Sequence, residues 1–236
     1  MDPIEIEYRF QIEAEQSDNF KVTLDATTLL CIDQIPIEQP DWTELKFHQC
    51  ANCPLDHTKV LRCPAAENMV RLVDRFDQLL SYDKTKVVVV TAERVVYSDT
   101  TVQRGICSLM GLLMATSRCP LTAFFKPMAR FHLPFASTEE TIWRATSTYL
   151  LAQYFRRQNG GNPDMAFEGL RDFYAQIQKV NKSFAKRLRI ACQQDSMVNA
   201  IILLDMFAKS MPSAIEESLE EIHHLFVPYL RHADPP

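Results

Sequence analysis

The stretch that organises this chain reads His48-Gln-Cys50-Ala-Asn-Cys53-Pro54-Leu-Asp-His57 and continues, six residues later, as Cys63-Pro64. It places three thiols and two imidazoles within sixteen residues. Cys50 and Cys53 can chelate one metal ion from a single turn, and Cys63 can return to the same ion from a short loop. Tetrahedral metal sites and iron–sulfur clusters are both assembled in this way. The stretch therefore predicts a metal centre around which the N-terminal part of the chain folds.

A closed tetrahedral site needs a fourth ligand, and Cys119 in Ser117-Arg118-Cys119-Pro120 is the preferred candidate. It lies at a proline-bounded break after an expected helix, where the thiol can turn toward a site. His48 and His57 are the alternatives, although a histidine beside cysteines more often supports a ligand than replaces one. We therefore expect a metal site, with Zn as occupant and a 4Fe-4S cluster as the alternative. The expected ligands are Cys50, Cys53, Cys63 and Cys119.

Proline follows three of these four thiols, Cys53, Cys63 and Cys119. Proline fixes the backbone beside a ligand, and the same neighbour occurs in ferredoxin-type cluster loops. Two alternatives compete with the metal site, namely ordinary buried thiols and a redox Cys-x-x-Cys pair. A thioredoxin-type pair opens a helix, whereas here proline follows the second cysteine and no helix continues from it. The remaining thiols lie in apolar patterns and are assigned to the core: Cys31, Cys107 and Cys192.

Composition limits the function classes open to the chain. With 236 residues, 47% of them hydrophobic and 23% charged, it is typical of a soluble globular protein. A net charge of −5 argues against a nucleic-acid partner, which would require a basic face. The acidic N-terminus lacks the features of a signal peptide, and no apolar run approaches the ~20 residues that span a bilayer. We expect a cytoplasmic protein with no membrane association, and a protein partner or homo-oligomer stays open.

Hydrophobic periodicity predicts a small sheet in the first part of the chain. Residues 4–12 and 19–30 alternate apolar and polar positions and are expected to form an antiparallel hairpin. Residues 42–48 are expected to form a third strand that delivers His48 and Cys50. Helical spacing over residues 65–82 predicts one helix, and the β-branched residues 86–97 predict one further strand.

The rest of the chain has helical periodicity, with Pro212 expected to separate the last two helices. The expected helices cover residues 101–116, 137–157, 165–190, 195–209 and 213–231. The fold class is therefore α+β, a small N-terminal antiparallel sheet with one helix followed by an all-helical C-terminal portion packed on it. We expect the β-rich portion 1–98 and the helical portion 99–236 to form one integrated domain.

A second polar cluster lies at Arg130-Phe131-His132-Leu133-Pro134-Phe135, followed by Glu139 and Glu140. His132 with a carboxylate could act as an acid–base pair. A core histidine bonded to a backbone carbonyl is the preferred interpretation, since no nucleophile or phosphate-binding loop accompanies it. Polar residues on the later helices are interpreted as structural: Arg187, Arg189, Asp195 and Asn199. Whether the protein is an enzyme stays open.

The segment Gly111-Leu-Leu-Met-Ala-Thr-Ser-Arg-Cys119-Pro120, taken with Cys50-x-x-Cys53-Pro54 and Cys63-Pro64, resembles an uncharacterised bacterial family. Phe131-His-Leu-Pro-Phe135 fits the same resemblance, which covers most of the chain from His48 onward. In that family a glycine is usual where this chain has Arg118. The family has no assigned activity, so the resemblance implies that these cysteines belong together and implies no function.

The sequence thus predicts a metal-binding cytoplasmic protein that serves as a structural, regulatory or interaction module. The rival class is an iron–sulfur redox or sensor protein, or an enzyme that uses the metal.

Overall fold

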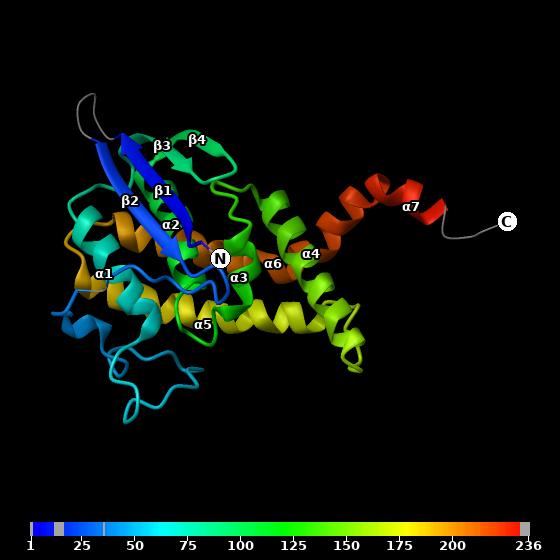
Figure 1. Ribbon diagram of the computed structural model, residues 1–236, viewed down its shortest axis with the longest axis horizontal. Helices are drawn as coiled ribbons and strands as arrows, with labels where there is room; N and C mark the ends of the chain where they lie inside the picture. Colours follow the sequence, from blue (N-terminus) through cyan, green and yellow to red (C-terminus); the bar gives the residue numbers. More distant parts are fainter. Residues whose placement is uncertain (1, 12–16, 35, 232–236) are drawn as a thin grey trace. The chain divides into compact units, whose positions relative to one another are not determined.

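The computed structural model describes residues 2–11, 17–34 and 36–231. It confirms the α+β class, because an antiparallel sheet at the N-terminal end is followed by a series of helices (Figure 1). The order of strands in the sheet is β2-β1-β3-β4, and every neighbouring pair is antiparallel.

The predicted first hairpin is confirmed as β1 (Ile4–Gln11) paired with β2 (Ser17–Leu24). The extension of the second strand over residues 25–30 is wrong, because β2 ends at Leu24, and residue 12 of the first predicted strand lies outside the described residues. Alternation along β1 buries Ile6, Tyr8 and Phe10 on one face of the strand. Glu5 and the other residues that alternate with them lie on the opposite face, toward solvent. Tyr8 stands opposite Phe20 of β2, so buried aromatic residues meet across the two strands.

The single strand predicted over residues 86–97 is wrong, because the structure has a hairpin there. Its strands are β3 (Lys84–Val90) and β4 (Val95–Thr101). The Thr91 amide donates to the Arg94 carbonyl at 3.0 Å and closes the turn. This turn contains neither glycine nor proline, and β-branched residues continue on both sides of it, so periodicity alone gave no sign of a break.

The strand predicted over residues 42–48 is also wrong. A 3-10 helix, η1 (Asp41–Thr43), is followed by turns, and the backbone pairs with residues 61–63 only locally. The Leu45 amide donates to the Leu61 carbonyl and the Cys63 amide donates to the Thr43 carbonyl, each at 2.8 Å. Trp42 and Leu45 are both buried and stand three residues apart, which suits a turning backbone rather than the two-residue period of a strand.

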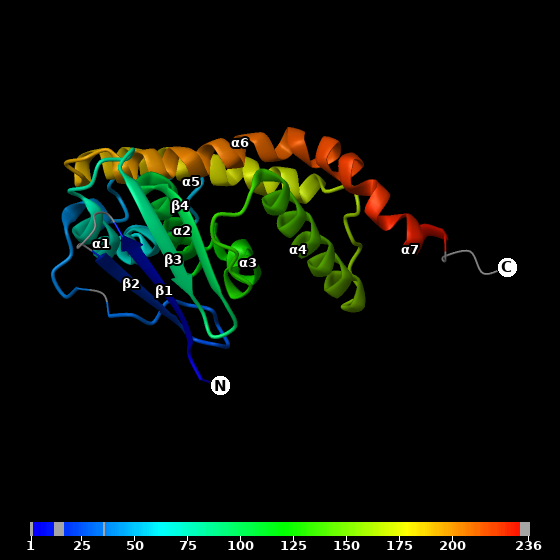
Figure 2. The same ribbon diagram turned by 90° about the horizontal axis from the view of Figure 1, so that it is seen from above.

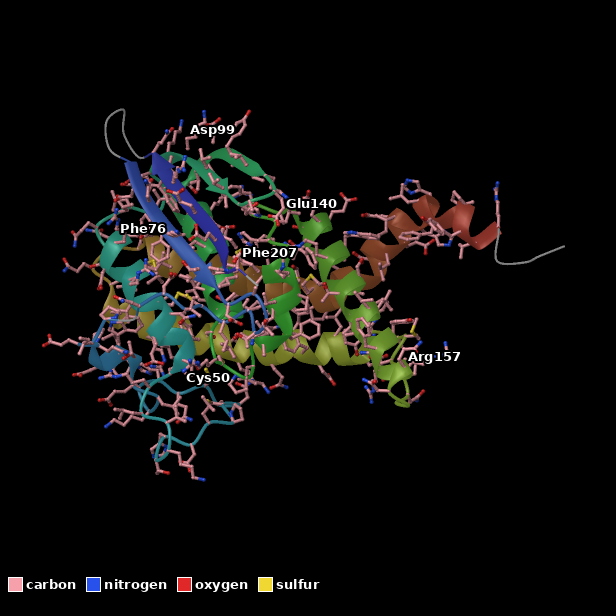
Figure 3. All side chains as sticks on the ribbon, viewed as in Figure 1. Cys50, Phe76, Asp99, Glu140, Arg157 and Phe207 are labelled. Carbon is pink, nitrogen blue, oxygen red and sulfur yellow. The ribbon has the colours of Figure 1, made fainter. Side chains whose placement is uncertain are left out.

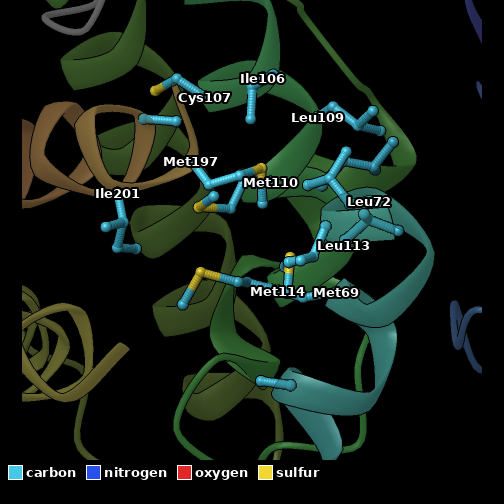
Figure 4. Close-up of a cluster of buried hydrophobic side chains, with 14 of the residues drawn as sticks. Met69, Leu72, Ile106, Cys107, Leu109, Met110, Leu113, Met114, Met197 and Ile201 are labelled. Atoms are coloured by element: carbon cyan, nitrogen blue, oxygen red, sulfur yellow. The ribbon is translucent and has the colours of Figure 1, made fainter. Parts of the chain in front are cut away.

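Two helices, α1 (Pro64–Phe76) and α2 (Val102–Ala115), cover the inner face of the sheet (Figures 1 and 2). Both were predicted, although α1 ends at Phe76 rather than at residue 82. The rings of Phe10 and Phe76 lie 4.7 Å apart and join the sheet to α1. The core behind α2 is rich in methionine and leucine (Figure 4), with Met69, Leu72, Leu109, Met110, Leu113, Met114, Met197 and Ile201 among its buried members.

The later helices follow short turns. They are η2 (Ala123–Phe125), α3 (Lys126–Arg130), α4 (Thr138–Gln158), α5 (Glu168–Ala191), α6 (Ser196–Ile222), η3 (His223–Phe226) and α7 (Val227–Arg231). Ser137 and Glu140 form the capping box that opens α4.

The prediction that Pro212 separates two helices is wrong, because α6 continues through it. Proline removes one amide donor inside a helix, a cost of about 3 kcal/mol. The flanking residues Met211 and Ile215 are buried, and this burial favours an uninterrupted helix. The Ser210 hydroxyl donates to the Phe207 carbonyl, and the Ser213 hydroxyl donates to the Ser210 carbonyl. These two carbonyls near the proline therefore have hydrogen-bond donors.

The chain divides into two compact units. One contains Met1–Phe135 and Gln176–Met206, and the other contains Ala136–Ala175 and Phe207–Pro236. The sheet, α1, α2 and all seven cysteines belong to the first unit. In the second unit, Tyr149 donates to Asp164 at 2.6 Å and the rings of Trp143 and Phe226 lie 5.7 Å apart.

Residues 196–215 of α6 are long and apolar enough, by length and composition, to cross a bilayer. This is a weak indication, since core helices of soluble proteins meet the same criterion. Met197, Ala200 and Ile201 of this stretch are buried in the core of the first unit, and 28% of the stretch is buried in all.

Gly105 and Gly111 of α2 offer a matched test of the packing between helix and sheet. A Cβ at Gly105 would lie 2.6 Å from Phe10 Cε1 and 2.9 Å from Val87 Cγ2, whereas a Cβ at Gly111 meets only Leu204 Cδ2 at 3.7 Å. We expect Gly105→Ala to destabilise the protein by about 1–3 kcal/mol through overpacking. We expect Gly111→Ala to stabilise it by up to about 1 kcal/mol through helix propensity. Urea denaturation measures both, and equal effects from the two variants would contradict this packing.

Candidate metal centre

The fold brings the four predicted thiols into one region of the first unit. Burial, and then the negative charge of Cys63, Cys53 and Cys119, raise the pKa of Cys50 to about 12, while a hydrogen bond with Ser183 opposes the shift. Because charge–charge effects weaken with distance, the Cys50 sulfur lies within electrostatic range of the other three thiols. Cys63 and Cys119 are buried, Cys50 and Cys53 are half-buried, and all are free thiols (Cys50 is labelled in Figure 3).

Cys63 is the N-terminal cap of α1, and Pro64 opens the helix. Burial raises the pKa of the Cys63 thiol. The nearby Arg187 guanidinium and hydrogen bonds from the backbone amides of Ala66 and Ala65 act in the opposite direction. The first turn of a helix has amides without helical partners, and these favour negative charge on a side chain at the cap. The position therefore suits a thiolate once an external cation offsets the cost of burial.

Cys119 repeats this arrangement in the turn after α2. Burial raises the pKa of its thiol, while backbone amides of Leu121 and Thr122 and the Thr122 hydroxyl lower it. The two amides lie two and three residues after the cysteine, which is also their spacing at Cys63. In each Cys-Pro turn, the amides two and three residues after the cysteine favour the charged form of the thiol and lower its pKa.

Buried hydroxyls hold the turn that carries Cys119. Ser117 Oγ accepts from the Cys119 amide at 3.2 Å, and Thr122 Oγ1 donates to the Met114 carbonyl at 2.7 Å. Both hydroxyl residues are buried, whereas Arg118 is exposed. The bulky Arg118 side chain therefore points to solvent and leaves the surroundings of the Cys119 thiol open.

One face of α5 holds the cysteine loop. Asn52, between Cys50 and Cys53, donates from Nδ2 to the carbonyl and side-chain oxygens of Gln176 at 3.2 and 3.0 Å. Ser183, about two helical turns further along α5, lowers the pKa of the Cys50 thiol. Arg187 follows four residues later, so these three α5 positions share one side of the helix.

Arg187 fixes the start of the same loop through three backbone carbonyls. Its Nη1 donates to Trp42 O at 2.6 Å and to Glu44 O at 2.7 Å, and its Nη2 donates to Leu45 O at 3.0 Å. The side chain is only 1% exposed. Arg187 is the residue that sequence reasoning missed. The sequence feature that could have identified Arg187 is its position on the apolar face of α5, where Phe184 and Leu188 are buried.

The thiols do not meet at a single point in the geometry of a bound ion. Within the described parts of the chain, no group of three or more His, Cys, Asp or Glu side chains is placed to hold one metal ion.

The two candidate histidines of the loop are exposed to solvent. His48 has a positive φ of 46° and its ring meets the edge of Phe47, with centroids 4.9 Å apart. His57 lies beside Asp56 and contributes to the lowered pKa of that carboxyl, after the Thr58 amide and hydroxyl. Both rings are thus more solvent-exposed than the four thiols.

His132 is half-buried and bonded to a side chain of the sheet. A hydrogen bond of 2.5 Å joins its Nε2 to the hydroxyl of Tyr8, and a second of 2.9 Å joins that hydroxyl to Ser108 Oγ. The candidate partner Glu140 is engaged in the capping box of α4. Asp195 also has a structural role, since it accepts hydrogen bonds from Ser81 and Asn199.

The fold and the thiol cluster define an α+β protein with a candidate four-cysteine centre. A family model for a domain of unknown function (DUF6901) matches residues 6–227, so the chain belongs to this family. This supports the predicted membership in an uncharacterised family. No curated protein and no solved structure matches the chain.

The raised pKa of Cys50 predicts slow alkylation in the metal-free folded protein. A thiol whose pKa is about 12 is almost wholly protonated at pH 8, and only the thiolate reacts. We expect iodoacetamide to label Cys50 roughly a thousandfold more slowly than in the chain unfolded in urea, with the rate still rising above pH 10. Peptide mass spectrometry locates the label, and equal rates in the two states at pH 8 would contradict the burial.

His132→Gln is expected to lower stability by about 1 kcal/mol through the altered bond to Tyr8, and to leave metal content unchanged. Tyr8→Phe is the matched variant, and the double variant shows whether the two effects share one bond. Thermal unfolding and metal analysis measure the outcome. Loss of metal from a folded His132→Gln protein would place this histidine at the metal centre.

Proposed function

We propose that this protein is a metal-binding protein whose centre is held by Cys50, Cys53, Cys63 and Cys119. The observation that carries the proposal is the convergence of four free thiols from three separate segments of the chain. Cys119 comes from the turn after α2, so its recruitment joins the helical part of the first unit to the cysteine loop. Cys119 lies far from the cysteine loop in sequence. A shared metal therefore explains the grouping of the four thiols better than chance does.

The surroundings of the thiols support a negatively charged, metal-bound state. Paired backbone amides face Cys63 and Cys119, and the cationic Arg187 lies near Cys63. These groups stabilise negatively charged thiolates and give little stabilisation to neutral thiols. A bound metal would supply the rest of the stabilisation that a buried thiolate requires, because a metal ion deprotonates the thiol that coordinates it.

Four thiolates can bind either a single zinc ion or an iron–sulfur cluster. We therefore propose zinc as the occupant, with a four-iron cluster as the alternative.

A centre with four protein thiolates has no open coordination position for a substrate. With a cluster, the function we infer is electron transfer or redox sensing; with zinc, it would be a structural or regulatory module. The seven free thiols suit a reducing compartment, so we place the protein in the cytoplasm.

Purification without oxygen, followed by metal analysis and visible absorption spectroscopy, tests the choice of metal. A colourless protein with one zinc per chain is the expected result. A brown protein with about four iron atoms and four acid-labile sulfides per chain would support the cluster instead. A wild-type protein that retains neither metal, even after reconstitution with iron and sulfide or with zinc, would contradict the proposed function.

Cys119→Ser is expected to lower both metal content and thermal stability, because loss of one of four ligands weakens the centre and the packing that it supports. Cys107→Ser and Cys192→Ser are the controls, since these thiols lie elsewhere in the core and should leave the metal in place. Full occupancy in Cys119→Ser, with loss in His48→Ala or His57→Ala, would show that the fourth ligand is an imidazole.

A further inference from the structure

The helix α4 of the second unit has large apolar residues on two of its faces. One face is buried and includes Ile142, Ala145 and Tyr149. A helix with one buried face usually presents polar residues on the opposite side. The opposite side of α4 instead carries four large apolar side chains that are exposed to solvent, Trp143 (45%), Leu151 (56%), Tyr154 (54%) and Phe155 (57%). Exposed apolar residues that cluster in this way are typical of a surface that binds another protein.

Trp143 and Tyr154 are suited to anchor such a contact. Residues three, four, seven or eight positions apart share one side of a helix, so Leu151 connects Trp143 to Tyr154 along α4. The Trp143 ring is also supported within the second unit, because its centroid lies 5.7 Å from that of Phe226 in η3. Rigid aromatic side chains of this kind supply much of the binding free energy of protein interfaces.

The two ends of α4 carry opposite charges. Glu139 and Glu140 lie in its first turn, Arg156 and Arg157 lie in its last turn, and all four are exposed. Figure 3 labels Glu140 and Arg157 near opposite ends of the helix, about 25 Å apart for a helix rise of about 1.5 Å per residue. Glu140 accepts the Ser137 amide in the capping box and keeps its negative charge there. No ion pair within the described parts of the chain engages Glu139 or Arg157.

The aromatic residues and the charges are arranged around one point near the middle of α4. Trp143 and Tyr154 are equally far from this point in sequence, and so are Glu140 and Arg157. Glu140 stands three residues before Trp143, and Arg157 stands three residues after Tyr154, so each charge lies on the same side of the helix as its neighbouring ring. A two-fold axis at this point would place Trp143 of one copy opposite Tyr154 of the other, and Glu140 opposite Arg157.

We propose that α4 pairs in antiparallel orientation with α4 of a second copy of this chain, through the face that carries Trp143 and Tyr154. A two-fold dimer requires one patch that is complementary to itself, and α4 supplies both halves of each contact. The aromatic rings contribute the binding free energy, and the charges set the direction. A parallel pairing would bring Glu140 beside Glu140 and Arg157 beside Arg157, where like charges repel.

This inference is independent of the proposed metal centre, because α4 belongs to the second unit and all seven cysteines belong to the first. The interface uses one helix from each copy. We therefore expect a reversible equilibrium between monomer and dimer rather than a permanent dimer.

Sedimentation of the full chain over a range of concentrations measures this equilibrium, and circular dichroism checks that each variant is folded. Tyr154→Glu should weaken the dimer at least roughly tenfold, because it places a carboxylate in the apolar centre of the interface. Tyr82→Glu is the matched control, since Tyr82 is an exposed tyrosine of the first unit, and it should dimerise like wild type. A wild type that stays monomeric at every concentration would overturn the inference and show that another part of the chain or another protein covers α4. An undiminished dimer in Tyr154→Glu would also overturn it.

A charge exchange tests the antiparallel register. Arg157→Glu places two carboxylates opposite each other in each half of the dimer and should weaken it roughly fivefold. Adding Glu140→Lys to Arg157→Glu restores opposite charges and should recover most of the wild-type affinity, although the monomer loses the capping-box bond and some thermal stability. A dimer that Arg157→Glu weakens and the double variant does not recover would overturn this register.

Hydroxyl-radical footprinting of the wild type needs no substitution and decides the question if a variant does not fold. We expect Trp143 and Tyr154 to be oxidised more slowly at concentrations where the dimer forms than in the dilute monomer, with Tyr82 unchanged. Equal oxidation of Trp143 and Tyr154 in monomer and dimer would overturn the inference.

Discussion

The hydrogen bonds from Arg187 to the backbone of residues 42–45 are the interaction on which the candidate centre depends. The loop between η1 and α1 contains little regular structure, so its buried carbonyls need partners that the loop itself does not provide. α5 provides them from the side chain of Arg187, and Asn52 adds a second attachment at Gln176. The positions of Cys50, Cys53 and Cys63 therefore depend on a helix that lies more than a hundred residues further along the chain.

The electrostatics around the thiols balance two opposing effects. Burial raises the pKa of Cys50, Cys63 and Cys119 and favours neutral thiols. Amide donors and a buried guanidinium act in the other direction and favour thiolates. A metal centre would resolve this opposition, since it supplies positive charge at the sulfur atoms without exposing them to water.

Local periodicity was sufficient for most of the fold and failed where the local signal was ambiguous. The first hairpin, α1 and α2 were predictable because their buried faces repeat with the period of a strand or a helix. The turn between β3 and β4 was missed because β-branched residues surround it. Pro212 was taken as a helix break because its local cost is certain, whereas the burial of Met211 and Ile215 that outweighs it is tertiary.

The sequence by itself determined which residue types could form the centre, because Cys-x-x-Cys spacing and the Cys-Pro turns at Cys63 and Cys119 depend only on local chain geometry. Tertiary structure alone decided that Cys119 lies within electrostatic range of the other three thiols, and that the histidines of the loop are exposed. It also decided that Arg187 is a buried cation beside sulfur rather than a surface residue. The physical reason is that burial and charge neighbours arise from contacts between segments far apart in the chain, which no local pattern encodes.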